Sequence, residues 1–431
     1  MGGIRVAYPG RGGTFLTPER RTRPYEEQPF SLGCLAKRSD ASDLADSRSS
    51  SLVYAFMSKR KRVGLLTGGG DCPGLNAVIR AVTKSLLQQH DVDVVGFEDG
   101  FLGLIERRTR TLSFPEVSGI LTQGGTILGA SNKANPFNYY RRGGADVSAQ
   151  VVKYCKDLRL SAVVALGGDG TMSIAHRFQE MGLPMVGVPK TIDNDLVGTD
   201  RTFGFDSAVT IATEAIDRIH TTAQSHHRIM IVETMGRYAG WIALYAGVAS
   251  GSDVILIPEI PYSVDAIAEA CNQRARAGQQ FTIIAVAEGA KPEGGEQTVE
   301  QTVEDSPDPV RLGGVGHVLA NELRDLVSSE VRTTVLGHMQ RGGTPTPFDR
   351  TLSTAFGAYA AAMVSAEETG RMVALQGGRL TSVPLDEVAN KTRTIPLDHP
   401  MLATAQAVNT SFGTSDFALE FSGTEPTGRM C

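Results

Sequence analysis

The chain has 431 residues, of which 41% are hydrophobic, 21% are charged and 48 are glycine. A chain of this length is expected to form two to three domain-sized units of roughly 150 residues each. Its 42 lysines and arginines are outnumbered by 47 acidic residues, which excludes the overall positive field needed to hold nucleic acids or acidic membranes.

The sequence also lacks the features of membrane and exported proteins. No run approaches about 18 consecutive apolar residues, and the first residues contain no apolar signal core. The five cysteines are scattered without CxxC spacing, which argues against a disulfide framework and against structural zinc. We therefore expect a cytoplasmic protein.

Residues 1–58 are predicted to form a poorly ordered N-terminal extension, because they mix Arg, Ser, Gly and Pro without sustained apolar periodicity. The basic run at 59–62 directly precedes an apolar segment. We interpret it as the solvated entry to a strand rather than as a localisation or nucleic-acid signal.

Seven short apolar runs, separated by helical stretches, begin at Val63. Because the runs are continuous and rich in β-branched residues, they predict parallel strands buried on both faces in a doubly wound arrangement. Functional residues are then expected at the carboxyl ends of the strands. The runs are residues 63–66, 92–97, 162–166, 185–188, 228–233, 254–257 and 282–287.

The chain holds more strands than one small sheet needs. We predict an α/β fold with two doubly wound, mainly parallel sheet domains and an active site in the cleft between them. The first domain is expected to contain residues 59–204 and about 340–376, and the second residues 205–339. The stretch 288–316, rich in Gly, Glu, Pro and Thr, is predicted to be a mobile surface loop or an insertion, and residues 377–431 to be a C-terminal accessory arm.

Residues 65–76, Leu-Leu-Thr-Gly-Gly-Gly-Asp-Cys-Pro-Gly-Leu-Asn, read as a strand that turns on three glycines and enters a helix near Pro73. Free backbone amides at the start of a helix favour a phosphate group. Glycine-rich turns also arise for purely steric reasons, so this motif alone leaves both interpretations open.

Residues 163–171, Val-Val-Ala-Leu-Gly-Gly-Asp-Gly-Thr, repeat the same arrangement after a second predicted strand. The glycines allow close approach of a phosphate, and the carboxylate of Asp169 is an oxygen ligand suited to Mg²⁺. The alternative is that Asp169 only caps the following helix, but a cap does not require a glycine on each side.

Residues 188–195, Val-Pro-Lys-Thr-Ile-Asp-Asn-Asp, follow a third predicted strand and place Asp193 and Asp195 two positions apart. In an extended segment this spacing directs both carboxylates to the same side. Phosphoryl transfer to an alcohol needs a metal ion on the donor phosphates, cations on the transferred group and a carboxylate that takes the hydroxyl proton. Together with Asp169, the motif supplies these carboxylates.

These three motifs, in this order, resemble the phosphofructokinase family, and the resemblance covers about residues 63–375. It implies transfer of the γ-phosphoryl group of ATP to the C1 hydroxyl of fructose 6-phosphate in glycolysis. It also implies that Asp193 is the general base, that Thr191 contacts the sugar or the transferred phosphate, and that Asp195 shares Mg²⁺ with Asp169. The implied donor site consists of Gly70, Lys133, Gly168, Asp169, Gly170 and Thr171.

Four further motifs of the family stand at residues 225–228, 235–240, 287–289 and 332–341. By resemblance, fructose 6-phosphate is bound by the residues Met235, Gly236, Arg237, Glu288 and His338, and its 6-phosphate by Arg228, Arg332 and Arg341. The family's pattern implies that two of these arginines reach a neighbouring subunit's site in a homodimer or homotetramer.

The two arginines that would cross between subunits are Arg228 and Arg332. The alternative for both is a surface ion pair, the commonest role of an exposed arginine. For His338, a structural role is the alternative to sugar binding.

Two positions distinguish ATP-using from pyrophosphate-using members of the family. Pyrophosphate enzymes typically carry Asp after Gly-Gly-Asp and Lys before Thr-Ile-Asp, whereas this chain has Gly170 and Lys190. Gly170 leaves room for the nucleotide, and an added cation is easier to accommodate than added bulk, so we expect ATP as the donor. Pyrophosphate is the alternative. Lys133 stands where the family usually has an arginine beside the donor phosphates.

Two other protein classes fit the sequence less well. NAD and lipid kinases share the Gly-Gly-Asp-Gly turn, but they lack the motifs at residues 191–195 and 338–341. A catalytically silent subunit would be expected to have lost part of the carboxylate set, which here is complete.

Overall fold

The computed structural model describes residues 61–302 and 310–415. The extension predicted for residues 1–58 and the last part of the predicted C-terminal arm lie outside these residues. All seven predicted strands are present at or within about two residues of their expected bounds. The two sheets that they form are mainly parallel, as predicted.

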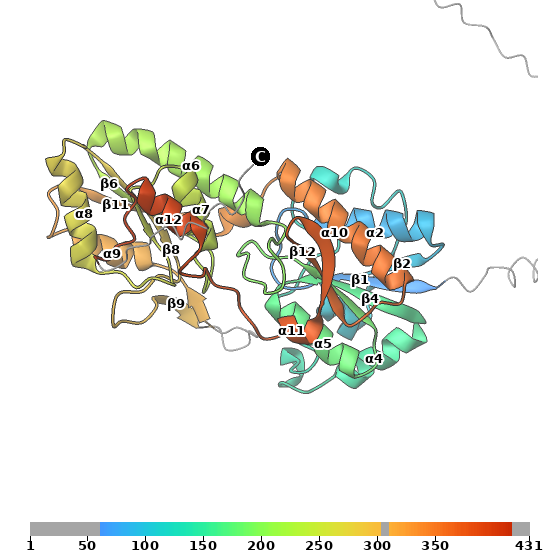
Figure 1. Cartoon of the computed structure of the whole chain (residues 1–431). Coiled ribbons are helices and arrows are strands. Elements are labelled where there is room, and N and C mark those ends of the chain that lie inside the picture. The colour runs from blue at the N-terminus through green and yellow to red at the C-terminus, as the bar shows by residue number, and fades with distance from the viewer. Residues whose placement is uncertain (1–60, 303–309, 416–431) are drawn as a thin grey trace, which may run out of the picture. The chain divides into compact units, whose positions relative to one another are not determined.

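The first sheet has seven strands in the order β13-β12-β5-β4-β1-β2-β3 (Figure 1). Its five central strands are parallel, and the two edge strands β3 and β13 run antiparallel to their neighbours. The strands are β1 (Arg62–Thr67), β2 (Asp93–Phe97), β3 (Thr109–Leu112), β4 (Leu160–Gly167), β5 (Met185–Pro189), β12 (Arg371–Gln376) and β13 (Arg379–Pro384).

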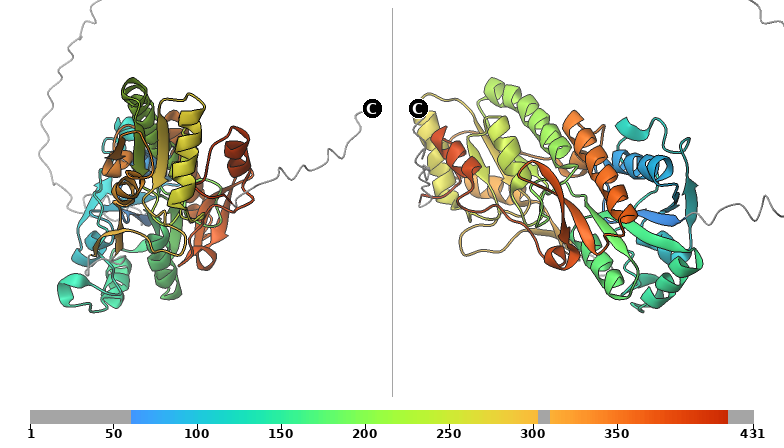
Figure 2. Two further views of the ribbon diagram at one scale, coloured as in Figure 1. Left: turned by 90° about the vertical axis from the view of Figure 1, so that its left-hand side faces the viewer. Right: turned by 45° about the vertical axis from the view of Figure 1, so that its right-hand side comes forward.

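Helices cover both faces of this sheet. On one face α2 and α10 pack side by side, as Figures 1 and 2 show, and α4 and α5 lie on the other face. Glycine at position 357 of α10 permits the close approach, because a Cβ there would lie 2.7 Å from the Cβ of Ala81 in α2. The helices are α2 (Leu75–Gln89), α4 (Ser148–Asp157), α5 (Asp169–Glu180) and α10 (Pro347–Ser365).

Successive side chains of the central strands enter two different cores. Val63, Leu65 and Val164 join the core that includes residues of α2 and α10. Leu66 and Val163 join the core that includes residues of α4 and α5. Because side chains alternate along a strand, a strand covered on both faces must be apolar throughout, and this explains the continuous runs in the sequence.

The second sheet has four parallel strands in the order β11-β6-β8-β7. Residues of α6 and α7 pack on one face, and residues of α8 and α9 pack on the other. The elements are β6 (Ile229–Thr234), β7 (Val254–Leu256), β8 (Thr282–Ala287), β11 (Val331–Val335), α6 (Phe205–His226), α7 (Trp241–Ala249), α8 (Val264–Arg276) and α9 (Val315–Leu323).

Two predicted segments differ in the structure. The stretch 288–316, predicted as a surface loop, contains the antiparallel strands β9 (Val299–Thr302) and β10 (Val310–Leu312), which pair with each other. The arm expected from residue 377 begins with β13, which extends the first sheet. The short helices are α3 (Phe101–Glu106), η1 (Ile120–Thr122), η2 (Tyr140–Arg142), η3 (Gly337–Arg341), α11 (Leu385–Val388) and α12 (Pro400–Ala407).

No helix within residues 61–302 and 310–415 is both long and apolar enough to cross a membrane.

Candidate active site

The three motifs of the first sheet follow the neighbouring strands β1, β4 and β5, and they are held together by backbone hydrogen bonds. The amide of Gly68 donates to the carbonyl of Leu166 at 2.8 Å, and the amide of Lys190 donates to the carbonyl of Gly167 at 3.0 Å. A Cβ at Gly68 would collide with the side chain of Thr171, so the first two turns need this glycine to pack closely. The sequence order of the motifs thus becomes one contiguous edge of the sheet.

The turn after β4 leads into helix α5 and shows which residue is the N-cap of that helix. Gly168 occupies the N-cap position, Asp169 is the first residue of the helix, and no side chain caps this end. Asp169 is therefore not the N-cap. Gly170 is exposed, and a Cβ placed on it would meet nothing within 4 Å. Packing within the fold therefore does not require glycine at position 170.

The loop after β5 buries two carboxylates, those of Asp193 and Asp195, which are 3% and 5% exposed. The loop is fixed from within, because the hydroxyl of Thr202 donates to the carbonyl of Thr191 at 2.7 Å. The backbone amide of Thr202 donates to the side-chain oxygen of Asn194 at 3.0 Å. Within the described residues, Oδ1 of Asp193 is buried and has no hydrogen-bond partner.

The three predicted carboxylates influence one another. The pKa of Asp195 is raised to about 7, first by burial and then by the negative charges of Asp193 and Asp169, while Arg237 opposes the shift. A cation at this position would relieve the repulsion. The carboxylates of Asp169 and Asp195 therefore fit a magnesium ion.

A magnesium ion here would take the rest of its ligands from elsewhere. The described residues contain no cluster of three or more His, Cys, Asp or Glu side chains able to hold a metal. This agrees with the way Mg²⁺ is usually held, by one or two carboxylates together with substrate phosphates and water.

Cations lie beside the first glycine turn. Lys190 is 4% exposed, and its ammonium donates to the carbonyl of Gly70 at 2.5 Å. Burial lowers the pKa of Lys190, and the nearby guanidinium of Arg341 lowers it further. Arg341 itself donates to the carbonyl of Asp71 at 3.3 Å. Lys133 is exposed, two residues after Ser131, which forms a β-bridge with Gly68.

The second sheet contributes the loops after β6 and β8. The carboxylate of Glu288 accepts hydrogen bonds from the amides of Gly236 at 3.2 Å and Arg237 at 2.9 Å. Burial is the main cause that raises the pKa of Glu288 to about 7, and Asp193 adds to the shift. Met235 is half-buried beside these residues. A guanidinium nitrogen of Arg237 lies 3.6 Å from Oδ1 of Asp169, so loops of the two sheets meet at one site.

The predicted phosphate arginines do not all meet within one chain. Arg341 lies at the glycine turn with η3, which also carries the exposed His338. Arg228 and Arg332 lie at the amino ends of β6 and β11 and share one partner, Glu330, to which Nε of Arg228 donates at 2.5 Å. Since β6 spans six residues, they are roughly 20 Å from the loop 235–240 at its other end. The ion-pair alternative is thus present in the single chain.

A phosphofructokinase family model matches residues 62–364, well over half of the chain. The chain belongs to the phosphofructokinase family. The family predicted from the three motifs is therefore confirmed.

Curated relatives of this family carry two kinds of name. The chain is 49% identical to "ATP-dependent 6-phosphofructokinase 2" of Clostridium perfringens, over 83% of this chain and 100% of the relative. It is 50% identical to "Pyrophosphate--fructose 6-phosphate 1-phosphotransferase" of Amycolatopsis mediterranei, over 78% of this chain and 97% of the relative. Overall identity therefore does not separate the two phosphoryl donors.

Solved structures show the same fold. A Saccharomyces cerevisiae phosphofructokinase matches with a TM-score of 0.66 and 30% identity, over 82% of this chain and 47% of that chain. The present chain thus spans about half the length of the yeast chain. The structure of a pyrophosphate-dependent phosphofructokinase from Nitrosospira multiformis matches with a TM-score of 0.68 but only 19% identity, and supports the fold alone.

One residue that the family motifs did not reveal contacts this site. Arg393 lies in the segment between α11 and α12, for which the sequence offered no motif, and its backbone amide donates to the carbonyl of Asp195 at 2.6 Å. No periodicity or spacing in its neighbourhood marks it, because its partners are about 200 positions earlier in the chain.

Proposed function

We propose that this chain is an ATP-dependent 6-phosphofructokinase, which transfers the γ-phosphoryl group of ATP to the C1 hydroxyl of D-fructose 6-phosphate. The products are fructose 1,6-bisphosphate and ADP, and the reaction belongs to glycolysis in the cytoplasm. The observation that carries the proposal is the meeting of the carboxylates of Asp169, Asp193 and Asp195 with Arg237 and Glu288 from the second sheet. The first group suits a metal-bound phosphate donor, and the second suits a sugar phosphate.

Asp193 is proposed as the general base. One of its oxygens is buried and lacks a hydrogen-bond partner among the described residues, so it is free to accept the proton of the C1 hydroxyl. Asp169 and Asp195 would hold Mg²⁺, whose charge stabilises the donor phosphates when it is bound. The glycine turns, from Gly70 and from Gly168 to Thr171, would present backbone amides to those phosphates, with Lys133 nearby.

The residues of the second sheet are proposed to bind the sugar. Glu288 fixes the loop that holds Met235, Gly236 and Arg237 through its two amide contacts, and this places the loop beside Asp169. Thr191 and His338 would complete the sugar contacts. We accordingly propose that residues 59–204 and about 340–376 bind the donor and that residues 205–339 bind fructose 6-phosphate.

The 6-phosphate is proposed to be bound by Arg341 of one subunit and by Arg228 and Arg332 of a neighbour. Three guanidiniums suit a dianion, since each donates a planar pair of hydrogen bonds. The position of Arg228 and Arg332 at the far end of their sheet supports this arrangement, because within one chain they cannot reach the site. A homodimer or homotetramer would then be required for activity.

The choice of donor rests on two residues. Gly170 leaves open space at the start of α5 where an aspartate would bring bulk and negative charge next to the nucleotide. Lys190 is compatible with ATP because it can neutralise the leaving diphosphate. The same lysine, together with the Amycolatopsis mediterranei relative, supports the second candidate, a pyrophosphate-dependent fructose 6-phosphate phosphotransferase.

The deciding experiment measures fructose 1,6-bisphosphate formed by the purified chain with Mg²⁺ and fructose 6-phosphate, with ATP or pyrophosphate as the donor. Product with ATP alone supports the proposal. Product with pyrophosphate alone would replace ATP by the second candidate, and no product with either donor would overturn both.

A further inference from the structure

Arg393 approaches the loop that carries the catalytic carboxylates with both its backbone and its side chain. Nη1 of Arg393 lies 3.0 Å from the carbonyl oxygen of Asp200 and 3.2 Å from that of Thr199. A third carbonyl, that of Asn194, lies 3.5 Å away. With the 2.6 Å bond from the Arg393 amide to the Asp195 carbonyl, one residue thus spans both ends of the loop 194–200.

The same residue is tied to the second sheet through Trp241, the first residue of α7. The guanidinium carbon of Arg393 lies 4.4 Å from the centroid of the indole ring. The indole N–H in turn donates to the carbonyl of Arg393 at 3.2 Å. Because α7 directly follows the loop that contains Arg237, Arg393 links the loop of the carboxylates to the loop of the proposed sugar site.

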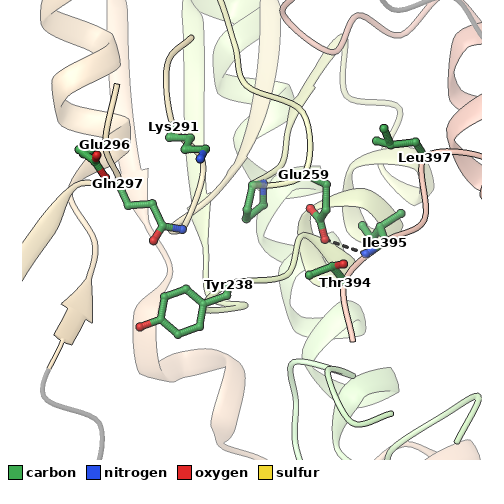
Figure 3. A pocket seen from close by; sticks show the side chains of 9 residues that line it. Tyr238, Glu259, Lys291, Glu296, Gln297, Thr394, Ile395 and Leu397 are labelled. Carbon is green, nitrogen blue, oxygen red and sulfur yellow. Dashed lines mark hydrogen bonds between the residues drawn. The ribbon is translucent and has the colours of Figure 1, made fainter. Parts of the chain in front are cut away.

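The next residues of the segment strengthen this link. The amide of Ile395 donates to the carboxylate of Glu259 at 2.8 Å, as Figure 3 shows. The same carboxylate accepts a hydrogen bond from the amide of Gly240 at 3.1 Å. Gly240 is the last residue of the loop 235–240, which contains Arg237. The segment 393–395 is therefore held between the two loops by hydrogen bonds on both sides.

These contacts combine hydrogen bonds with a ring contact. A partly buried cation is costly unless it has hydrogen-bond partners, and here the backbone carbonyls of the loop accept from Nη1. Burial lowers the pKa of Arg393, but a guanidinium stays charged at all physiological pH values. A lysine ammonium could also donate to these carbonyls, but it cannot at the same time place a planar guanidinium over the indole of Trp241.

We propose that Arg393 is a positioning residue for phosphoryl transfer: it fixes the backbone of the loop 194–200, and with it the directions of Asp193 and Asp195, against the loop that carries Arg237. The inference rests on the proposed function. Its contacts are with the backbone of this loop and with Trp241, so it would act through the geometry of the carboxylates. Misplacing catalytic groups by about 1 Å can lower turnover by roughly 100-fold, and the loss appears in kcat rather than in sugar binding.

The test compares three variants of the full chain by kcat, by KM for fructose 6-phosphate and by Tm. Arg393→Met keeps the apolar part of the side chain and removes the guanidinium group. For this variant we expect kcat to fall roughly 10- to 100-fold and KM for fructose 6-phosphate to change by less than about threefold. Arg393→Lys is expected to restore part of kcat. Arg371→Met is the matched control, since Arg371 also donates to backbone, to the carbonyl of Ser382 at 2.7 Å, but from strand β12 to strand β13 and not to the backbone of the loop 194–200.

A second measurement does not depend on activity. Trp241 is the only tryptophan of the chain, so its fluorescence reports directly on the contact with Arg393. We expect the emission to shift in Arg393→Met but not in Arg371→Met.

The outcomes separate the two proposals. A wild-type chain that forms no fructose 1,6-bisphosphate contradicts the proposed function. An active wild type combined with an Arg393→Met kcat within twofold of it would overturn the positioning role. Equal losses of kcat and Tm in Arg393→Met and Arg371→Met would also overturn the positioning role of Arg393. Should Arg393→Met fail to fold, Arg393→Gln, which also lacks the positive charge, is judged by the same criteria.

Discussion

A guanidinium nitrogen of Arg237 lies 3.6 Å from a carboxylate oxygen of Asp169, although the two residues follow strands of different sheets. This contact joins a proposed sugar-binding residue to a proposed metal ligand. Arg237 also lowers the pKa of Asp195, and so favours the ionised form that a metal ion needs. Substitutions in either loop are therefore expected to affect the use of both substrates.

The general base is tested by Asp193→Ser. We expect kcat to fall by roughly two to four orders of magnitude, the usual contribution of a positioned base, while fructose 6-phosphate still binds. Turnover is measured with ATP, and sugar binding is followed by the fluorescence of Trp241. Asp325→Ser, at an exposed position, is the control. Turnover near the wild-type value would remove Asp193 from the role.

The donor choice is tested by Gly170→Asp and Gly170→Ala. Because a Cβ at this position meets open space, neither variant is expected to lower Tm appreciably. For Gly170→Asp we expect kcat/KM for ATP to fall by roughly 100-fold and use of pyrophosphate to increase, since the added negative charge repels the nucleotide phosphates. Gly170→Ala adds a methyl group without a charge, so comparison of the two variants separates the effect of size from the effect of negative charge. An aspartate variant that uses ATP as well as the wild type does would show that position 170 does not select the donor.

The shared phosphate site is tested by mixing two inactive chains. A chain with Arg332→Ser cannot supply the arginine that completes the neighbouring subunit's site. A chain with Asp193→Ser lacks the general base of its own site. A mixed dimer keeps one site with an intact Asp193 and a neighbour's Arg332, so co-expression is expected to restore about a quarter of the activity. Each variant expressed alone is the control. Absence of any recovery in confirmed mixed oligomers would favour the surface ion pair with Glu330 as the only role of Arg332.

A buried carboxyl of helix α10, that of Asp349, predicts a pH effect on stability. Burial raises the pKa of Asp349 from 3.8 to about 6, although this carboxylate accepts the amide and hydroxyl of Ser207. A raised pKa in the folded state means that stability is highest below the unfolded value and is lost as pH rises through about 6. The shift of about two units corresponds to at most about 3 kcal/mol.

The variant Asp349→Asn isolates this effect, since an amide does not titrate. We expect the difference in unfolding free energy between wild type and Asp349→Asn to move in favour of the variant between pH 4 and pH 8, by up to about 3 kcal/mol. Denaturant unfolding at several pH values measures it. A difference that stays constant with pH would mean that Asp349 keeps an ordinary pKa.

Much of this protein was determined by local sequence. The seven predicted strands were recognisable because a strand that is covered on both faces is apolar throughout. The glycine turns were recognisable because close approach of the backbone needs glycine at specific positions. Strands such as β11, with the sequence Val-Arg-Thr-Thr-Val, were missed because polar residues interrupt the apolar pattern. The edge strands β3 and β13 escaped for a similar reason, since one-sided burial tolerates polar positions.

Tertiary structure alone decided which of these residues meet. Sequence placed Arg228, Arg332 and Arg341 in one functional group, but only strand direction shows that the first two lie at the opposite end of the second sheet. Sequence gave no sign of Arg393, whose partners Asp195 and Trp241 are distant in the chain. Local patterns specify turns and strands because those depend on neighbouring residues, whereas a contact across the fold depends on how complete elements pack.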